Sequence, residues 1–254
     1  MTPGGTISSI QQLYYEDSGH GDAVVLLPGW GGSIIELDRL RHKLEYGFRV
    51  IAVDLPGSGR SQPQPRRYGA SYYLDDARDL LGLLDALRID VAHIAGFSDG
   101  GEEALLMAAL EPHRALSVIT WGAAGKVEAS EDRLAAVARV VDDPTEELRP
   151  LAAYLAEAYG PAQARVMTAT WADAMRTIIG DGGDISRSLA HRITCPALLI
   201  SGTYDPYCPP DLVREMAEAI PRGEFREAPQ AGHDVHLSHH QWLASAAADW
   251  LGGH

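Results

Sequence analysis

Short apolar runs alternate along the chain with longer segments in which apolar residues recur at helical spacing. The short runs are continuous and rich in branched residues, which is typical of strands buried on both faces of a sheet. Helical segments with short connections separate them, so we expect a mainly parallel sheet covered by helices on both faces. The strands are expected at 23–29, 48–57, 90–97, 115–122, 195–202 and 224–229, and the helices at 33–46, 71–87, 99–112, 209–220 and 240–251.

The ends of these elements carry further signals. Residues 6–10 and 12–16 form β-like runs ahead of the first buried strand. Ser33 and Ser71 precede two of the helices and are expected to cap them, because a serine hydroxyl there can accept a hydrogen bond from a free backbone N–H. Gly47 is expected to close the first of these helices.

The alternation stops between residues 123 and 192, where three helical patterns follow one another. We expect these helices at 131–141, 144–159 and 161–179. An all-helical insertion between two halves of one sheet is typical of a lid over the strand ends, where ligands bind. The sequence therefore predicts an α/β core made of residues 1–122 and 193–254, with a helical lid at 123–192. The last helix presents one face that comprises Met167, Thr170, Trp171, Ala174 and Ile178.

The composition argues against several classes of protein. Of the 254 residues 46 % are hydrophobic and 22 % charged, which favours a globular fold with a substantial core. The net charge of −14 repels phosphate backbones and the basic residues are scattered, so we expect no nucleic-acid partner. No apolar run approaches the roughly 20 residues of a membrane span, and the N-terminus lacks the features of a signal peptide. We therefore expect a cytoplasmic protein with no membrane partner.

Neither the cysteines nor the histidines predict a disulfide or a metal site. Cys195 and Cys208 lack finger spacing and are expected to be reduced and structural. The histidine-rich segment 233–240 has no H-E-x-x-H pattern and no identified third ligand, so we expect no metal there.

The segment 96–100, with the sequence GFSDG, fits the pattern G-x-S-x-G. It follows a predicted strand and precedes a predicted helix, as a nucleophile elbow does, and such a bend leaves no room for Cβ atoms at Gly96 and Gly100. The bend would present the Ser98 hydroxyl to a substrate. The alternative is an ordinary strand-to-helix turn in which Ser98 caps the helix.

A serine nucleophile needs a base that takes its proton and an acid that orients the base. Where this elbow occurs, the order along the chain is serine, acid, histidine. Asp205 and His233 follow two predicted strands in that order. We therefore expect Ser98, His233 and Asp205 to form a catalytic triad.

Other candidates for the acid and the base are weaker. The loop after the strand at 115–122 offers no carboxylate before Glu128. His236 is the alternative base, and its expected role is to pack or to support the loop. His239 and His240 are expected to face solvent at the start of the last helix.

The reaction would also need donors for the oxygen of the tetrahedral intermediate, commonly two backbone N–H groups. One is expected to be the amide of Asp99. The other would come from the loop after the strand at 23–29, where Trp30 follows Gly29. Only the backbone of Trp30 is required for this, and its side chain either lines the pocket or packs in the core.

The chain contains a set of short motifs: LLPG at 26–29, SDGG at 98–101, WGA at 121–123, CPALLI at 195–200, DP at 205–206 and HDVHL at 233–237. Together these motifs resemble the α/β-hydrolase family, and the valacyclovir hydrolase (biphenyl hydrolase-like) group in particular. The resemblance implies the α/β-hydrolase fold, a serine esterase activity and no cofactor. It further implies that the acid next to the nucleophile, Asp99, accepts the α-amino group of an amino-acid ester.

The carboxylate of Asp99 is unusual in this position on physical grounds alone. At about 5 Å from a developing oxyanion, and with an effective dielectric constant near 20, it would oppose the reaction by about 3 kcal/mol. A substrate ammonium group would cancel that repulsion. Alternatively, Asp99 points away and pairs with an arginine or stabilises the start of its helix.

The leading hypothesis is a serine hydrolase that cleaves small carboxylic esters, in particular α-amino-acyl esters, through an acyl-enzyme intermediate. Trp171 and Met175 of the lid are candidates for lining the substrate pocket, with core packing as their alternative role. Amides, lactones, thioesters and carbon–carbon bonds are alternative substrates, because fold and nucleophile are shared across these reactions. A non-catalytic binding module on the same fold is a further alternative. The sequence does not indicate an oligomeric state.

Overall fold

The structure is a computed structural model that describes residues 5–6 and 13–254. Within these residues the strands form one sheet with the order β1-β2-β4-β3-β5-β6-β7-β8. All neighbouring strands from β4 to β8 are parallel, whereas β1 and β2 join one edge in antiparallel fashion. The prediction of a mainly parallel sheet is therefore confirmed. The strands are β1 (Gly5–Thr6), β2 (Tyr14–Gly19), β3 (Ala23–Leu27), β4 (Arg49–Val53), β5 (Ala92–Phe97), β6 (Ala115–Trp121), β7 (Ala197–Gly202) and β8 (Gly223–Ala228).

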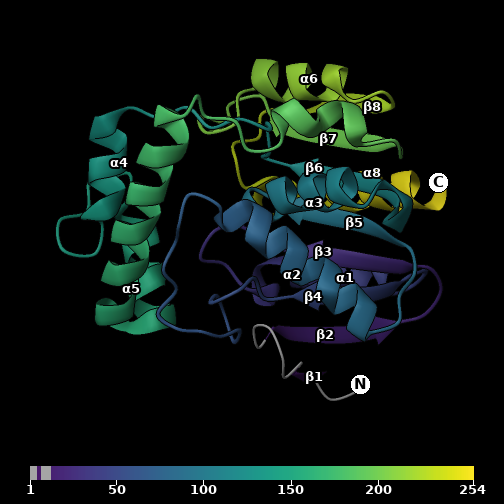
Figure 1. The fold of residues 1–254 in the computed structure, drawn as a ribbon, viewed down its shortest axis with the longest axis horizontal. Helices are drawn as coiled ribbons and strands as arrows, with labels where there is room; N and C mark the ends of the chain where they lie inside the picture. Colours follow the sequence, from purple (N-terminus) through teal and green to yellow (C-terminus); the bar gives the residue numbers. More distant parts are fainter. Residues whose placement is uncertain (1–4, 7–12) are drawn as a thin grey trace.

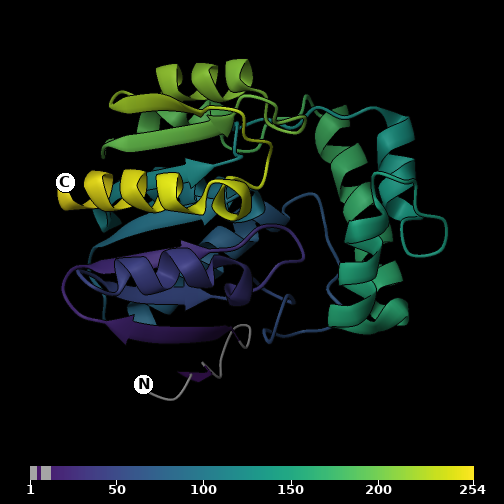
Figure 2. The ribbon, with the colours of Figure 1, turned by 180° about the vertical axis from the view of Figure 1, so that it is seen from behind.

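Helices cover both faces of this sheet (Figures 1 and 2). On one face lie α2 (Tyr72–Ala86), α3 (Asp99–Leu110) and α6 (Pro210–Ala219), and on the other lie α1 (Asp38–Leu44) and α8 (His240–Gly252). Alternate residues of β3 enter the two cores, Val25 and Leu27 on the side of α2 and α3, Val24 and Leu26 on the side of α1 and α8. This division follows from the two-residue period of a strand. Short helical turns complete the fold: η1 (Ile34–Leu37), η2 (Pro112–Arg114), η3 (Arg187–Arg192) and α7 (Val235–Ser238).

The ends of some elements differ from the sequence expectations. Of the β-like runs at 6–10 and 12–16, residues 7–10 and 12 lie outside the described residues. The Ser33 hydroxyl makes no cap bond, and the helix expected at 33–46 opens with the turn η1, whose first N–H, that of Ile34, donates to Asp54 Oδ1 at 2.7 Å. The Ser71 hydroxyl also does not cap its helix, since it donates to the Asp75 carboxylate at 2.7 Å.

Between β6 and β7 the chain is mainly helical, and this helical insertion, for which the bounds 123–192 remain a prediction, lies beyond the carboxyl ends of the parallel strands (Figure 2). It contains α4 (Glu131–Ala138) and α5 (Arg149–Gly180). Our predicted helix start at Pro144 is wrong. α5 begins five residues later with Pro150 in its first turn, a position that proline also favours. The separation of two helices at Gly160 is confirmed, because Gly160 has non-helical backbone angles (φ 73°, ψ 152°) and α5 consists of two helical segments that meet there at a kink before Pro161.

One buried carboxylate holds both ends of this insertion. Glu102 of α3 accepts hydrogen bonds from the backbone N–H groups of Ala124 at 2.9 Å and Gly125 at 2.7 Å, where the insertion begins. It also accepts one from the Ser186 hydroxyl at 2.8 Å, where the insertion ends. Burial raises the pKa of Glu102 to about 7 against the opposing effect of these donors.

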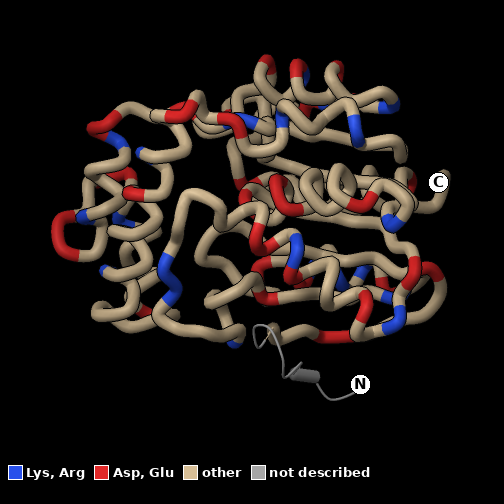
Figure 3. The backbone as a smooth tube through the Cα atoms, viewed as in Figure 1, with Lys and Arg blue, Asp and Glu red and all other residues tan. Residues whose placement is uncertain are grey.

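Lys and Arg residues are interspersed along the backbone with the more numerous acidic residues in both the sheet region and the insertion (Figure 3). Among the residues that the structure describes, no helix combines the length and the apolar character that crossing a bilayer requires.

Candidate active site

Ser98 lies at a sharp bend between β5 and α3. Its φ of 51° and ψ of −116° are strained for a residue with a side chain. A Cβ atom on Gly96 would lie 2.1 Å from the carbonyl oxygen of Gly100, and one on Gly100 would lie 2.4 Å from that of Pro28. Only glycine fits at these two positions. The Ser98 side chain makes no capping bond to α3, so the bend differs from an ordinary capped turn.

Ser98, His233 and Asp205 form one chain of hydrogen bonds. His233 Nε2 lies 3.0 Å from Ser98 Oγ, and His233 Nδ1 lies 2.8 Å from Asp205 Oδ2. The buried carboxylate favours the tautomer in which Nδ1 donates to it, which leaves Nε2 to accept the serine proton. The backbone N–H groups of Tyr207 and Cys208 donate to Asp205 Oδ1 at 2.8 and 2.9 Å and fix the carboxylate.

The other histidines of this region lie outside that chain. His236 is buried and accepts a hydrogen bond from the Trp121 indole on its Nδ1, and burial lowers its pKa to about 4. Its ring packs on Phe97, which also packs on His233. His236 therefore supports the loop, as the sequence suggested for it. His239 and His240 are half-buried rather than solvent-facing, since α8 packs their end of the chain against the sheet.

The loop after β3, residues 28–32, which we call the oxyanion loop, lies against Ser98. A Cβ atom on Gly29 would lie 3.4 Å from the Ser98 Cβ. Within residues 5–6 and 13–254, neither the Trp30 N–H nor the Asp99 N–H has a hydrogen-bond acceptor. Both backbone donors expected at the oxyanion are therefore available.

The Asp99 side chain is buried and bonded to two tyrosines of α2. The hydroxyl of Tyr72 donates to its Oδ2 at 2.8 Å and that of Tyr73 to its Oδ1 at 2.9 Å. Burial raises the pKa of Asp99 to about 6, while the tyrosine hydroxyls and the more distant Arg66 favour ionisation. Arg66 forms its own ion pair with Asp76, so among the described residues Asp99 has no ion-pair partner.

The comparisons with known proteins identify the family of this chain. Residues 24–246 match the model of the alpha/beta hydrolase family. The chain belongs to this family.

Its relatives in the alpha/beta hydrolase family also define the class of enzyme. The chain is 32 % identical over 249 residues to human "Serine hydrolase BPHL", covering 94 % of this chain and 83 % of that protein. It is 30 % identical to the pimeloyl-[acyl-carrier protein] methyl ester esterase of Chromobacterium violaceum, over 94 % and 98 % of the two chains. The present protein is therefore a serine hydrolase of this family, and its resemblance to the biphenyl hydrolase-like group is confirmed.

A solved structure supports the fold of this alpha/beta hydrolase. The enol-lactonase of Burkholderia xenovorans superposes with a TM-score of 0.78 at 23 % identity, covering 95 % of this chain and 97 % of that one. The expectation of the α/β-hydrolase fold is confirmed.

The remaining residues expected at the pocket of this alpha/beta hydrolase lie in two environments. Trp171 of α5 is half-buried and packs on Trp30, with ring centroids 4.9 Å apart. Both indole N–H groups are buried without an acceptor in the described part of the chain. Met175 is fully buried in the core, the alternative that the sequence left open for it.

Several residues next to the site were not foreseen from the sequence. Tyr72 and Tyr73 lie in the helix predicted at 71–87, and no role was predicted for them from the sequence. Their hydroxyls were a hint, because a buried tyrosine hydroxyl usually needs a hydrogen-bond partner. The Tyr207 ring lies 4.9 Å from the His233 ring, and the guanidinium of Arg133 from α4 covers it at 4.1 Å. The position of Tyr207 two residues after Asp205 was the one indication in the sequence that it would lie near the site.

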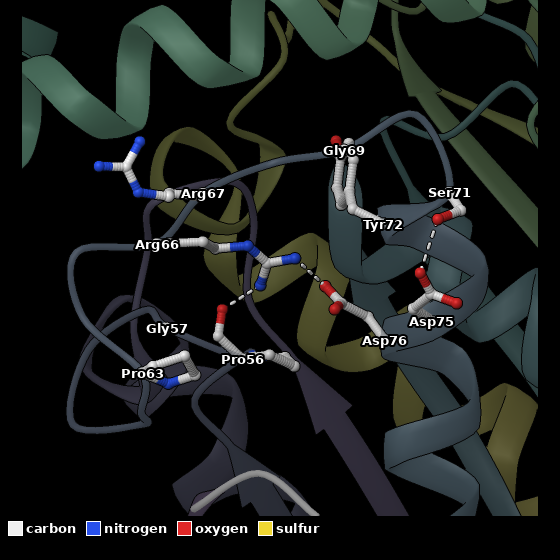
Figure 4. A pocket seen from close by; sticks show the side chains of 10 residues that line it. All are labelled: Pro56, Gly57, Pro63, Arg66, Arg67, Gly69, Ser71, Tyr72, Asp75 and Asp76. Carbon is white, nitrogen blue, oxygen red and sulfur yellow. Dashed lines mark hydrogen bonds and ion pairs between the residues drawn. The ribbon is translucent and has the colours of Figure 1, made fainter.

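A cavity of about 150 Å³ lies beside this site, between the loop at 56–69 and the start of α2 (Figure 4). Its wall includes Arg66, whose guanidinium donates to Asp76 and to the Pro56 carbonyl, while Arg67 points away from them. The Tyr72 ring lines the cavity and its hydroxyl reaches Asp99. Among residues 5–6 and 13–254, no group of His, Cys, Asp and Glu side chains could hold a metal ion.

Proposed function

We propose that this serine hydrolase cleaves small carboxylic esters through an acyl-enzyme on Ser98, with α-amino-acyl esters as its preferred substrates. The observation that carries the proposal is the hydrogen-bonded chain from Ser98 through His233 to Asp205. This arrangement can remove a proton from a serine hydroxyl and return it to a leaving group.

In the first half of the reaction, Ser98 Oγ attacks the ester carbonyl carbon while His233 Nε2 takes its proton. The N–H groups of Trp30 and Asp99 stabilise the resulting oxyanion. When the intermediate collapses, His233 donates the proton to the leaving alcohol, and the acyl group stays on Ser98. Asp205 stabilises the transient imidazolium.

In the second half, water attacks the acyl-enzyme and His233 acts as its base. Collapse of the second tetrahedral intermediate breaks the bond to Ser98 Oγ, which takes the proton back from His233. The carboxylic acid leaves and the starting state returns. The esterase from Chromobacterium violaceum supports an ester as the bond cleaved.

The preference for α-amino-acyl esters rests on Asp99. Its buried carboxylate has two tyrosine donors and no ion-pair partner among the described residues, and a carboxylate has room for about four donors. An ammonium group bound there would offset the repulsion between Asp99 and the oxyanion. The helical insertion, with Trp171 next to Trp30, would act as a lid and set the specificity for the alcohol.

A fluorophosphonate probe and a panel of p-nitrophenyl esters test this proposal together. Wild type and the exposed control Ser188→Ala should be labelled and active, whereas Ser98→Ala should be neither. Amino-acyl esters should exceed matched desamino esters in kcat/KM, and equal values would reject the role of Asp99. A wild type that is unlabelled and inactive on all esters would favour a binding module. Activity confined to amides, lactones, thioesters or carbon–carbon bonds would correct the bond class.

A further inference from the structure

We propose that Tyr154 and Tyr159 of α5 are positioning residues for the oxyanion loop, so that the helical insertion contributes to the chemical step. This inference rests on the proposed function, because it assigns a role in stabilising the oxyanion. It concerns two side chains that act through the backbone around Trp30 and do not touch the reacting atoms.

Both tyrosine hydroxyls donate to one carbonyl oxygen of the oxyanion loop. Tyr159 lies 2.8 Å and Tyr154 lies 3.1 Å from the carbonyl oxygen of Gly31, which has a lone pair for each. Tyr159 is 7 % exposed and Tyr154 is 40 % exposed. The helical insertion therefore holds the residue that immediately follows Trp30.

Residues of the α/β core hold Gly29, which precedes Trp30. The Gly29 N–H donates to Glu36 Oε1 at 2.7 Å, and the Gly29 carbonyl accepts the Gly32 N–H at 3.0 Å. The residues on both sides of Trp30, Gly29 and Gly31, are thus bonded through their backbone to groups outside Trp30, while the Trp30 N–H has no acceptor among the described residues. Donors of an oxyanion hole are effective because they are oriented before the reaction.

The contact between α5 and the oxyanion loop is more than one pair of hydrogen bonds. The Tyr159 hydroxyl also accepts the Gly59 N–H at 2.9 Å, which links the loop after β4 to the same group. A Cβ atom on Gly31 would lie 3.1 Å from Leu155 of α5, so the helix packs directly on the loop. A displacement of α5 would therefore be transmitted to Trp30.

The competing explanation is that these hydroxyls only anchor the insertion. In that case their removal would lower stability and leave the rate of turnover unchanged. A positioning role instead lowers kcat and the affinity for an oxyanion-forming inhibitor in parallel, because both depend on the Trp30 N–H.

The test compares Tyr159→Phe, Tyr154→Phe and the double variant with wild type and with Tyr46→Phe, which changes a tyrosine that is 84 % exposed. Each is assayed with the best p-nitrophenyl ester and inhibited with a trifluoromethyl ketone. We expect kcat to fall about 10-fold in Tyr159→Phe and about 30-fold in the double variant, with KM within about twofold. The inhibition constant should rise by the same factors, while Tyr46→Phe matches wild type.

Unchanged kcat and inhibition constants in the double variant would overturn the inference, whether or not its melting temperature falls. Tyr154→Phe changes a partly exposed residue and provides a folded test if the others unfold; we expect a loss of about threefold there. A wild type that hydrolyses no ester would reject the proposed function and the inference together. An active wild type with equally active variants would reject the inference alone.

Discussion

His233 Nε2 lies 3.0 Å from Ser98 Oγ although 135 residues separate the two side chains in the sequence. The sheet brings them together, because Ser98 follows β5 and His233 follows β8, and parallel strands end at the same edge. The geometry of this contact depends on Asp205, which bonds to His233 and touches neither substrate nor Ser98.

Asp205→Asn should lower kcat about 10⁴-fold without unfolding the protein. The asparagine carbonyl can still accept the N–H groups of Tyr207 and Cys208, but its NH₂ group would face His233 Nδ1. The imidazole would then carry its proton on Nε2 and could not accept the serine proton. Ester hydrolysis and thermal unfolding measured on the same sample check this. Retention of more than a tenth of the wild-type kcat would contradict the role of Asp205.

The preference for amino-acyl over desamino esters should fall as the pH drops below about 6. The pKa of Asp99 is raised to about 6, so its carboxylate is ionised at neutral pH and protonated below that value. Only the ionised form attracts an ammonium group. The ratio of kcat/KM for the two esters, measured from pH 5 to 8, removes effects that are common to both, such as titration of the catalytic base.

Asp99→Asn supplies the control for that measurement. It should abolish the preference at every pH and leave the ratio of the two esters independent of pH. A ratio that still changes between pH 5 and 8 in this variant would assign the titration to another group.

Gly96→Ala should lower the free energy of unfolding by more than about 2 kcal/mol, because the added Cβ atom would lie 2.1 Å from the Gly100 carbonyl oxygen. Gly82→Ala in α2 is a matched control with no atom within 4 Å of the new Cβ. It should raise stability by roughly 0.5 to 1 kcal/mol, since alanine favours helices. Denaturant unfolding compares the two variants, and similar stabilities would be inconsistent with a crowded bend.

Glu102→Gln should make stability less dependent on pH. The folded-state pKa of Glu102, about 7, exceeds its ordinary value of 4.5, so the folded protein binds this proton more readily than the unfolded chain. Its contribution to stability is greatest below pH 4.5, decreases as the pH rises to about 7 and is constant above that. The difference in melting temperature between pH 5 and pH 8 should therefore be smaller in the variant. The exposed Glu146→Gln should behave as wild type, and an equal change in both variants would rule out Glu102 as the source.

The sequence predicts the parts of the site that depend on local pattern. The glycines around Ser98 and the strands before Asp205 and His233 are visible in short windows, and the order of the strand ends brings these residues to one edge. The contacts of Asp99 were not predictable, because they depend on how α2 rotates against α3 to direct Tyr72 and Tyr73 inward.

The insertion was the least predictable region. Pro144 and Pro150 both suit the first turn of a helix, and only packing decides between them. The bonds from Tyr154 and Tyr159 to Gly31 span 123 and 128 residues, and no local pattern carries information about them. The sequence of α5 places two tyrosines on the helix but gives no indication that their hydroxyls bond to a carbonyl so far away in the chain.

The hydrogen bonds that Glu102 accepts from Ala124, Gly125 and Ser186 have a consequence for protein engineering. The chain binds to this one carboxylate both where it enters the insertion and where it leaves it. The helices between these two points therefore form one exchangeable unit, a cassette, and a cassette from another protein could be grafted there without moving the sheet. The graft would have to supply a hydroxyl to the Gly31 carbonyl. A cassette that closes over the substrate but lacks that group would bind without turning over efficiently.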